Sequence, residues 1–450
     1  MAGIPRRSIT RSAKIASLPL GYAGRKAVGV GKRIGGAPAE AVAEQVRTLT
    51  AEQMFRVLGE LKGGMMKFGQ MLSIYEAALP EEIAKPFRES LTRLQEAAPP
   101  LPAAQLHAML AADLGPGWRQ RFREFDDHPV ASASIGQVHR AVWEDGRDVA
   151  VKVQYPGAAK ALHSDLVQIG RVFRLWARTL PGLDVRPLIQ ELQDRYIEEL
   201  DYGLEAEHQN AYAEAYAGDP DIAVPTVRAA TSHVLVADWV DGTPLATVIS
   251  SGTREQRDRC GILLLRLWLA GPTRTGLMHA DPHPGNFRLL DDGRLGVLDW
   301  GASSELPGGI PAVLGRLVRL ATDGEVDKLP AGMRAEGFIR PSMEVEPGAI
   351  DAFLSPLVDP AREERFRYSR DWLRSRALLV LDPRGPAYAG WRRLNLPPAY
   401  LLIHRVVLGG AGVLCQLGAE GPFRAEAMHH LPGFARPDET PADASATQVS

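Results

Sequence analysis

The residues with the clearest capacity for chemistry lie between positions 279 and 301. Asp281 is followed five residues later by Asn286 and thirteen residues after that by Asp299, which opens an Asp-Trp-Gly turn. Phosphoryl transfer needs a carboxylate that orients or deprotonates the acceptor, and oxygen ligands that hold Mg²⁺ against the phosphates. Asp281 is the candidate for the first task, and Asn286 and Asp299 are the candidate metal ligands. Turn formation explains any one of these residues but not their joint spacing.

These three residues need a strand and a turn to hold them. The apolar run from Leu295 to Leu298 predicts a strand that leads into Asp299, and Asp291-Asp292-Gly293 predicts a hairpin turn before it. The metal-ligand candidates would therefore lie at the open end of a short hairpin.

The basic half of such a site is predicted on another strand. Lys152 lies in the apolar run 149–154, and a cation there suits the α- and β-phosphates of a nucleotide, although many strand lysines simply face solvent. Its acidic partner should come from the acid-dense stretch around Glu199, Asp201 and Glu205. Asp201 and Glu205 can share a helical face at i,i+4, so Glu205 is favoured as the partner, with Glu199 next.

A phosphate-binding loop is expected upstream of Lys152, in residues 131–138. Its alanines allow fewer backbone conformations than glycine, so this loop should be stiff and admit phosphate less freely. The segment 238–240 corresponds to a hinge whose backbone would meet adenine. The predicted nucleotide contacts in these two segments are Ala131, Ser132, Ala133, Ser134, Ile135, Gly136, Val138, Asp238 and Val240.

The order of elements predicts an α+β, bilobal protein-kinase-like fold with a small β-rich N-lobe and a helical C-lobe. The 450-residue length allows two or three domains. Helices are predicted at 37–98, 103–114, 158–179, 187–217 and through much of the chain from Thr253, and strands at 121–125, 136–143, 148–154, 222–227 and 233–240. The predicted parts are a basic flexible arm (1–36), a helical extension (37–102), the N-lobe (103–240), the C-lobe (241–433) and a disordered tail (434–450).

Charge and composition narrow the class of protein. A net charge of −2 gives no argument for nucleic-acid binding, but residues 1–35 are basic with no acidic residue and could contact an anionic lipid surface if they are not simply solvated. Cys260 and Cys415 are too few for a disulfide framework. The apolar stretch 400–418 is interrupted by His404 and Arg405. We therefore expect a cytoplasmic protein that does not span a membrane, with peripheral membrane contact left open.

Four motifs, taken in order, resemble the UbiB/AarF (ADCK-type) atypical kinase-like family over roughly residues 40–420. Lys67-Phe68-Gly69-Gln70 is similar to its KxGQ motif, and residues 131–140 to its alanine-rich loop. Residues 199–201 resemble its ExD motif, and 279–286 with 299–301 its catalytic and metal loops. The first two strings are the most specific, because many phosphotransferases share the Asp/Asn/Asp set.

This resemblance implies ATP and Mg²⁺ as cofactors and a KxGQ helix over the nucleotide cleft. Lys67 and Gln70 would then join the catalytic residues and face Glu199 and Asp201. The chain departs from the family at Ser132, where the loop usually has alanine, and it shows no C-terminal hydrophobic hairpin of the kind that anchors some members in a bilayer.

Three activities follow as alternatives. The first is an atypical kinase or ATPase that supports quinone or isoprenoid-lipid metabolism. Phosphorylation of protein substrates is disfavoured, because Ala280 replaces the catalytic-loop arginine and no Ala-Pro-Glu motif follows Gly301. The second is a small-molecule phosphotransferase of the aminoglycoside or choline type, although such enzymes lack the KxGQ helix. The third is a non-catalytic, nucleotide-gated lipid-binding scaffold, which would not need Lys152, Asp281, Asn286 and Asp299 together.

Overall fold

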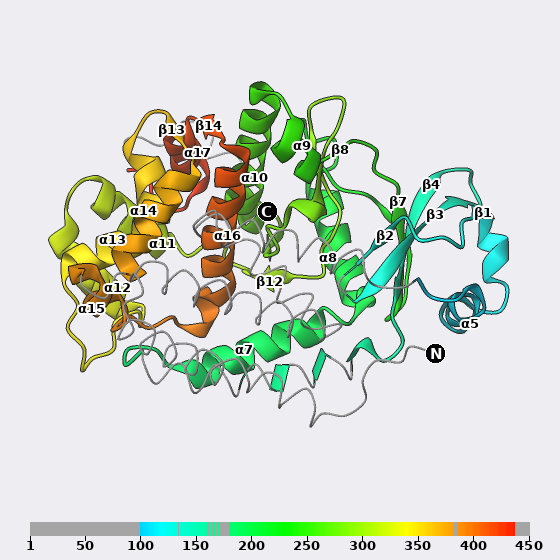
Figure 1. The fold of residues 1–450 in the computed structure, drawn as a ribbon, viewed down its shortest axis with the longest axis horizontal. Coiled ribbons are helices and arrows are strands. Elements are labelled where there is room, and N and C mark those ends of the chain that lie inside the picture. The colour runs from blue at the N-terminus through cyan, green and yellow to red at the C-terminus, as the bar shows by residue number, and fades with distance from the viewer. Residues whose placement is uncertain are drawn as a thin grey trace, which may run out of the picture.

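The computed structural model describes residues 100–133, 135–159, 162–163, 166–167, 170, 180–381 and 385–436. Within these residues the chain forms two lobes, a β-sheet lobe and a larger helical lobe (Figure 1). This is the predicted kinase-like α+β fold. The predicted basic arm and nearly all of the helical extension, with Lys67 and Gln70, lie outside the described residues. Ser134 and positions 437–450 of the predicted tail also lie outside them.

The N-lobe is built on an antiparallel sheet in the order β1-β3-β4-β7-β6, with β2 paired to β3. Alternate residues of β4, namely Val149, Val151 and Val153, are fully buried and belong to the same apolar cluster as helix α5. Because side chains alternate along a strand, Lys152 points to the opposite face. The elements are α5 Ala103–Leu114, β1 Phe122–Phe125, β2 Ala131–Ser132, β3 Gly136–Trp143, β4 Asp148–Gln154, β6 Val227–Ala230 and β7 Val234–Asp238.

Two helices, α7 (Val185–Glu198) and α8 (Tyr202–Ala215), occupy the region predicted as one helix over 187–217. The prediction was wrong at the break: α7 ends at Glu198, and Asp201 caps α8 by accepting a hydrogen bond from the Gly203 amide at 2.9 Å. Asp201 is therefore the N-cap of α8. Its carbonyl accepts the first helical hydrogen bond, from the Glu205 amide at 3.1 Å, but its side chain bonds the Gly203 amide and does not share a helical face with Glu205. Helix α8 packs against β6 and β7.

The C-lobe surrounds helix α10 with shorter helices and three small sheets. The strand predicted over 222–227 is two strands: β5 (Ile222–Ala223) pairs in parallel with β11 (Leu295–Val297) of the C-lobe, whereas β6 begins at Val227 in the N-lobe sheet. The prediction was wrong in joining them. The other elements described here are α9 Leu245–Ser251, α10 Arg254–Thr275, α11 Ala312–Thr322, α12 Leu329–Ala335, α13 Pro347–Arg362, α14 Arg370–Leu381, α15 Pro386–Trp391, α16 Leu401–Leu417, α17 Phe423–His430, β8 Thr243–Pro244, β13 Phe366–Arg367 and β14 Glu420–Gly421.

Helix α10 carries the catalytic segment to its place. It begins at a capping box formed by Thr253 and Gln256, and it ends where Gly276 adopts a left-handed conformation with a φ of 70°. Leu263, Leu264 and Leu267 on this helix are fully buried in the C-lobe core. The chain then turns directly into the strand that ends at His279, so a buried helix fixes the start of the catalytic loop.

One helix, Pro398–Leu417, is long and apolar enough to cross a membrane by length and composition. The sequence analysis expected no such segment because of His404 and Arg405. In the fold 67% of its apolar window is buried inside the C-lobe. Close packing of Gly410 against the Trp268 ring is one reason that this helix fits there, since a Cβ at 410 would lie 2.6 Å from that ring.

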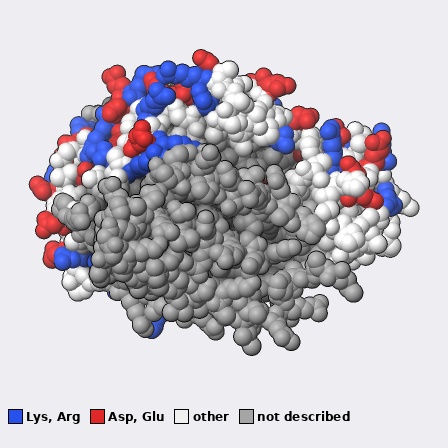
Figure 2. All heavy atoms as spheres, in the orientation of Figure 1, with Lys and Arg blue, Asp and Glu red and all other residues white. Residues whose placement is uncertain are grey.

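The surface shown in Figure 2 mixes acidic and basic side chains, with Lys and Arg densest over the region of β13 and β14. Arginines there have acidic partners; Arg254, for instance, forms an ion pair with Glu420. Cys260 and Cys415 are both buried free thiols.

Candidate active site

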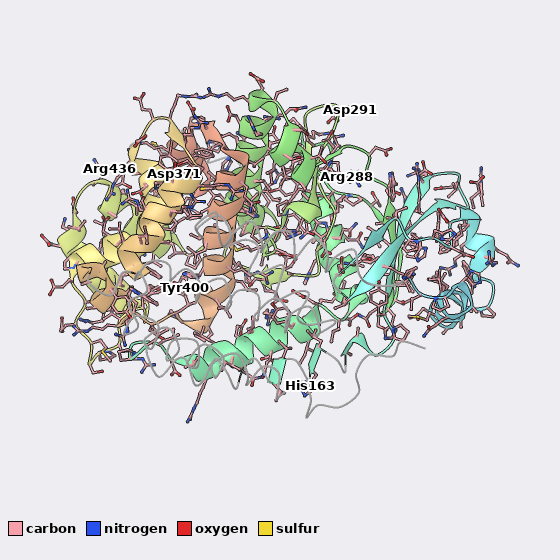
Figure 3. The ribbon with its side chains drawn as sticks, in the orientation of Figure 1. His163, Arg288, Asp291, Asp371, Tyr400 and Arg436 are labelled. Atoms are coloured by element: carbon pink, nitrogen blue, oxygen red, sulfur yellow. The ribbon has the colours of Figure 1, made fainter. Side chains whose placement is uncertain are left out.

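The two predicted metal ligands lie at the open end of a hairpin, as the sequence predicts. Strands β10 (Phe287–Leu289) and β11 (Leu295–Val297) pair with Phe287 opposite Val297. The Leu298 amide donates to the Asn286 carbonyl at 2.9 Å, so Asn286 and the residue before Asp299 are adjacent. Figure 3 shows Arg288 and Asp291 of this hairpin on the part of the C-lobe nearest the N-lobe sheet.

A second strand pair brings the catalytic loop to the same place. Strand β9 (Leu277–His279) pairs with β12 (Ser303–Glu305), and the Ala280 amide donates to the Ala302 carbonyl at 2.8 Å. The Asn286 side-chain amide donates to the Asp281 carbonyl at 3.2 Å. These contacts gather Asp281, Asn286 and the Asp299 turn within one small region of the C-lobe.

Lys152, on the N-lobe strand β4, contacts one carboxylate from α8 and one from the Asp299 turn of the C-lobe. Its ammonium donates to Glu205 Oε1 at 2.8 Å and Oε2 at 2.9 Å, and to Asp299 Oδ2 at 3.1 Å. Burial favours the neutral amine, but the Asp299 and Glu205 charges outweigh it and raise the pKa of Lys152 well above its usual value. Of the two glutamates predicted as partners, Glu205 makes this contact.

The Asp-Trp-Gly turn is anchored by buried aromatic rings. Trp300 is fully buried, 4.1 Å from the Tyr212 ring and edge-on to the His279 ring at 5.1 Å. A ring nitrogen of His279 lies 2.8 Å from the Asp299 carbonyl oxygen. Burial lowers the pKa of His279, so the neutral ring can donate to that carbonyl. The backbone of the Asp-Trp-Gly turn is thus fixed from the core side.

Arg405 is a component of the site that the sequence reasoning missed. From α16 its guanidinium donates to Asp281 Oδ1 at 2.9 Å, and both side chains are only 10% exposed. The sequence analysis treated Arg405 merely as an interruption of an apolar stretch. The missed signal was a lone cation inside an apolar helix, which implies a buried anionic partner.

The described part of the alanine-rich loop pairs with strand β3, which lies beside the strand that carries Lys152. The Ala133 amide donates to the Gly136 carbonyl at 2.8 Å, and Val138 lies directly opposite Lys152 in the β3–β4 register. Ala131 and Ser132 form the short exposed strand β2. Gly136 permits close packing, because a Cβ there would lie 2.3 Å from the Val153 carbonyl oxygen.

The hinge segment after β7 is held by arginines. Both carboxylate oxygens of Asp238 accept hydrogen bonds from Arg228 at 2.6 Å. The guanidinium groups of Arg140 and Arg288 lie over the Trp239 ring, 5.0 and 6.0 Å from its centre. Because both oxygens of its carboxylate accept hydrogen bonds from Arg228, Asp238 has only its backbone left to contact a ligand at the hinge.

The ExD residues do not contact Lys152. Glu199 is 5% exposed, at the break between α7 and α8, and Asp201 serves as the α8 cap. Near this break a cavity of about 330 Å³ lies between α7, α8, β12 and the start of α16. Its lining includes Arg195, His208 and Leu402, so it offers charged, polar and apolar surface beside the Asp299 turn.

The donor set fits a magnesium nucleotide. A carboxylate (Asp299) and an amide oxygen (Asn286) are ligands that Mg²⁺ accepts, and they stand at neighbouring ends of one hairpin. The Asn286 amide nitrogen is already used toward Asp281, which leaves its oxygen as the ligand atom. Lys152 supplies positive charge beside them.

Fold and site together define a protein of the kinase-like phosphotransferase class. Residues 93–328, just over half of the chain, match the ABC1 atypical kinase-like domain. The chain therefore belongs to the ABC1 atypical kinase-like family, the group that the sequence motifs indicated.

Individual relatives agree with this assignment. The chain is 30% identical over 355 residues to the mitochondrial atypical kinase coq-8 of Caenorhabditis elegans, covering 75% of this chain and 46% of the relative. It is 29% identical over 398 residues to the chloroplastic protein ACTIVITY OF BC1 COMPLEX KINASE 3 of Arabidopsis thaliana. This match covers 84% of this chain and 53% of the relative. The chain thus spans about half the length of these curated relatives.

A solved structure matches over most of the chain. It is titled as the complex of Rv3197 with erythromycin from Mycobacterium tuberculosis and is 45% identical. The match covers 89% of this chain and all of the other, with a TM-score of 0.67.

Proposed function

We propose that this protein is an atypical kinase or ATPase that binds Mg-ATP between its lobes. The observation that carries the proposal is the linkage of Lys152 to both Glu205 and Asp299, at 2.8 and 3.1 Å. A cation from the N-lobe sheet thus lies beside Asp299, the candidate metal ligand of the C-lobe, and this arrangement would suit a magnesium-bound nucleoside triphosphate.

Each residue then has a distinct task. Asn286 and Asp299 would hold Mg²⁺, which supplies neutralisation of phosphate charge when it is bound. Lys152, oriented by Glu205, would contact the α- and β-phosphates. Asp281, held in place by the Arg405 guanidinium, would orient the hydroxyl group or water that attacks the γ-phosphate.

Support for the wider role comes from the relatives. We propose quinone or isoprenoid-lipid metabolism as the context, since the relatives include atypical kinases of the coq-8 type. Lys67 and Gln70 are proposed to cover the cleft on the strength of the family resemblance. Contact with an anionic membrane surface through the basic N-terminal residues is part of the same proposal.

The test is nucleotide binding followed by turnover. We expect ATP or ADP with Mg²⁺ to raise the melting temperature of the full chain, and Asp299→Ala to abolish that shift. The Asp281→Asn variant should retain the shift and lose ATP turnover, because it removes the acceptor-orienting charge but no metal ligand. Turnover in the wild type should rise with anionic vesicles or phenolic quinone precursors. A thermal shift that persists in Asp299→Ala would remove this residue from the metal site.

A second candidate function is binding of a macrolide-type ligand. Its support is the 45% identity, over 89% of this chain, to the protein solved with erythromycin. Calorimetric titration with erythromycin, with and without ADP, tests binding. Mass spectrometry of the macrolide after incubation with ATP then separates the two readings: gain of one phosphoryl group indicates a small-molecule kinase, and binding without such gain indicates a ligand-binding role.

A further inference from the structure

The hydroxyl group of Tyr202 is a buried hydrogen-bond donor without an acceptor. Tyr202 is the first residue of α8, and its side chain is completely buried among Ile135, Ala206 and Leu235. The hydroxyl oxygen has no hydrogen-bond partner among the described residues. Buried polar groups are nearly always satisfied, so an isolated hydroxyl of this kind calls for a partner that the chain alone does not supply.

The neighbours of this hydroxyl group indicate what kind of acceptor it lacks. It lies against the bare Cα of Gly136 at the end of the alanine-rich loop, because a Cβ at that position would be only 2.8 Å from it. The Lys152 ammonium lies 4.8 Å from the centre of the Tyr202 ring. The phenol is therefore next to both the loop and the cation that the proposed function assigns to nucleotide phosphates.

The hydroxyl also remains a donor at neutral pH. Burial raises the pKa of Tyr202 well above its usual value, although the nearby Lys152 charge opposes this shift. A protonated phenol beside an ammonium group forms a pair of donors, which suits an anionic oxygen better than any neutral acceptor.

Resting on the proposed function, we propose that Tyr202 is a phosphate-binding residue, whose hydroxyl donates to a phosphate oxygen of the bound nucleotide alongside Lys152. In many nucleotide-binding loops glycine-rich backbone supplies such donors. Here alanines stand at 131 and 133, and a side chain from α8 adds a donor beside Gly136. Because the Tyr202 side chain is fully buried, Gly136 must move for a phosphate oxygen to reach its hydroxyl group.

The variant Tyr202→Phe tests this assignment because it removes only the hydroxyl. The ring and its contact with Lys152 remain. Tyr216→Phe is the control: it likewise removes a buried tyrosine hydroxyl, but one that belongs to the C-lobe core, beside Arg274. The ligands are ADP and adenosine, measured by calorimetry with full-length protein at fixed Mg²⁺. Adenosine is the comparison because it lacks the phosphates.

We expect Tyr202→Phe to weaken ADP binding by about tenfold, the loss typical of a hydrogen bond to a charged group, and to leave adenosine binding unchanged. Tyr216→Phe should change neither. The melting temperature without ligand should stay equal or rise in Tyr202→Phe, whereas a purely structural hydroxyl would lower it on removal.

Two failures are distinguishable. If the ratio of ADP to adenosine affinity in Tyr202→Phe equals that of the wild type, the assignment of Tyr202 alone is overturned. This is the result expected if the hydroxyl group bonds only a water molecule. A wild-type protein that binds no nucleotide at all overturns the proposed function, and this inference falls with it.

Discussion

The contact between Arg405 and Asp281 yields a quantitative prediction about stability. Arg405→Met retains much of the apolar stem but removes the guanidinium that contacts Asp281 at 2.9 Å. Asp281 is only 7% exposed, so the variant removes the guanidinium from a carboxylate that water barely reaches. Breaking a buried ion pair in this way costs about 3–5 kcal/mol. For a lobe of this size, we expect the melting temperature to fall by roughly 6 °C or more.

A double-mutant cycle isolates the charge from the packing. In an Asp281→Asn background the side chain at 281 is neutral, and removal of Arg405 should cost about 1 kcal/mol or less, because the buried guanidinium has then lost this carboxylate. The coupling between the two positions should therefore be about 2–4 kcal/mol. Thermal unfolding of the four proteins, followed by tryptophan fluorescence at pH 7.5, measures it. Equal costs of Arg405→Met in both backgrounds would refute the ion-pair reasoning.

Three further predictions concern the N-lobe and its link to the C-lobe. Ala133→Gly should loosen the phosphate loop and tighten nucleotide binding several-fold, and an unchanged Kd would mean that the alanine is incidental. Glu205→Gln removes one of the two carboxylates beside the buried Lys152 ammonium, so it should lower the pKa of Lys152 and weaken ADP binding. It should also cost about 3 kcal/mol of stability, measured by thermal unfolding. Retained ADP affinity would contradict this role of Glu205. Burial holds the pKa of His139 below its usual value, so the folded state takes up this proton later than the unfolded chain as the pH falls. The stability from the neutral ring, which accepts from Gln137 at 2.7 Å, is complete above about pH 6.5 and decreases below it. Between pH 7 and 5, His139→Gln should make the free energy of unfolding depend less steeply on pH, by up to about 1.4 kcal/mol per pH unit. An unchanged dependence on pH would contradict this account.

The sequence predicted local structure best where the hydrophobic pattern was strong. Strands β3 and β4 and helix α5 lie where alternation and helical spacing place them, and the hairpin before Asp299 forms at the predicted Asp-Asp-Gly turn. The pattern failed where tertiary context decided. β5 is a two-residue strand whose partner lies more than seventy residues further along the chain, so no local signal marks the lobe to which it belongs.

The site was only partly readable from the sequence. Glu205 was preferred over Glu199 by helical spacing to Asp201, yet Asp201 is a cap, so the preferred partner emerged from an incorrect argument. The actual reason is that Glu205 lies on the face of α8 that packs beneath the sheet, beside Lys152. Arg405 could not be paired with Asp281, because 124 residues separate them and only the packing of α16 brings them together.

The central claim is that Lys152, Asp281, Asn286 and Asp299 surround one magnesium nucleotide. Electron paramagnetic resonance with Mn²⁺ in place of Mg²⁺ tests it most directly. We predict one tightly bound Mn²⁺ per chain that appears only when ADP or ATP is present and is lost in both Asn286→Ala and Asp299→Ala. Tight nucleotide-dependent Mn²⁺ binding that survives both substitutions would contradict this account of the site.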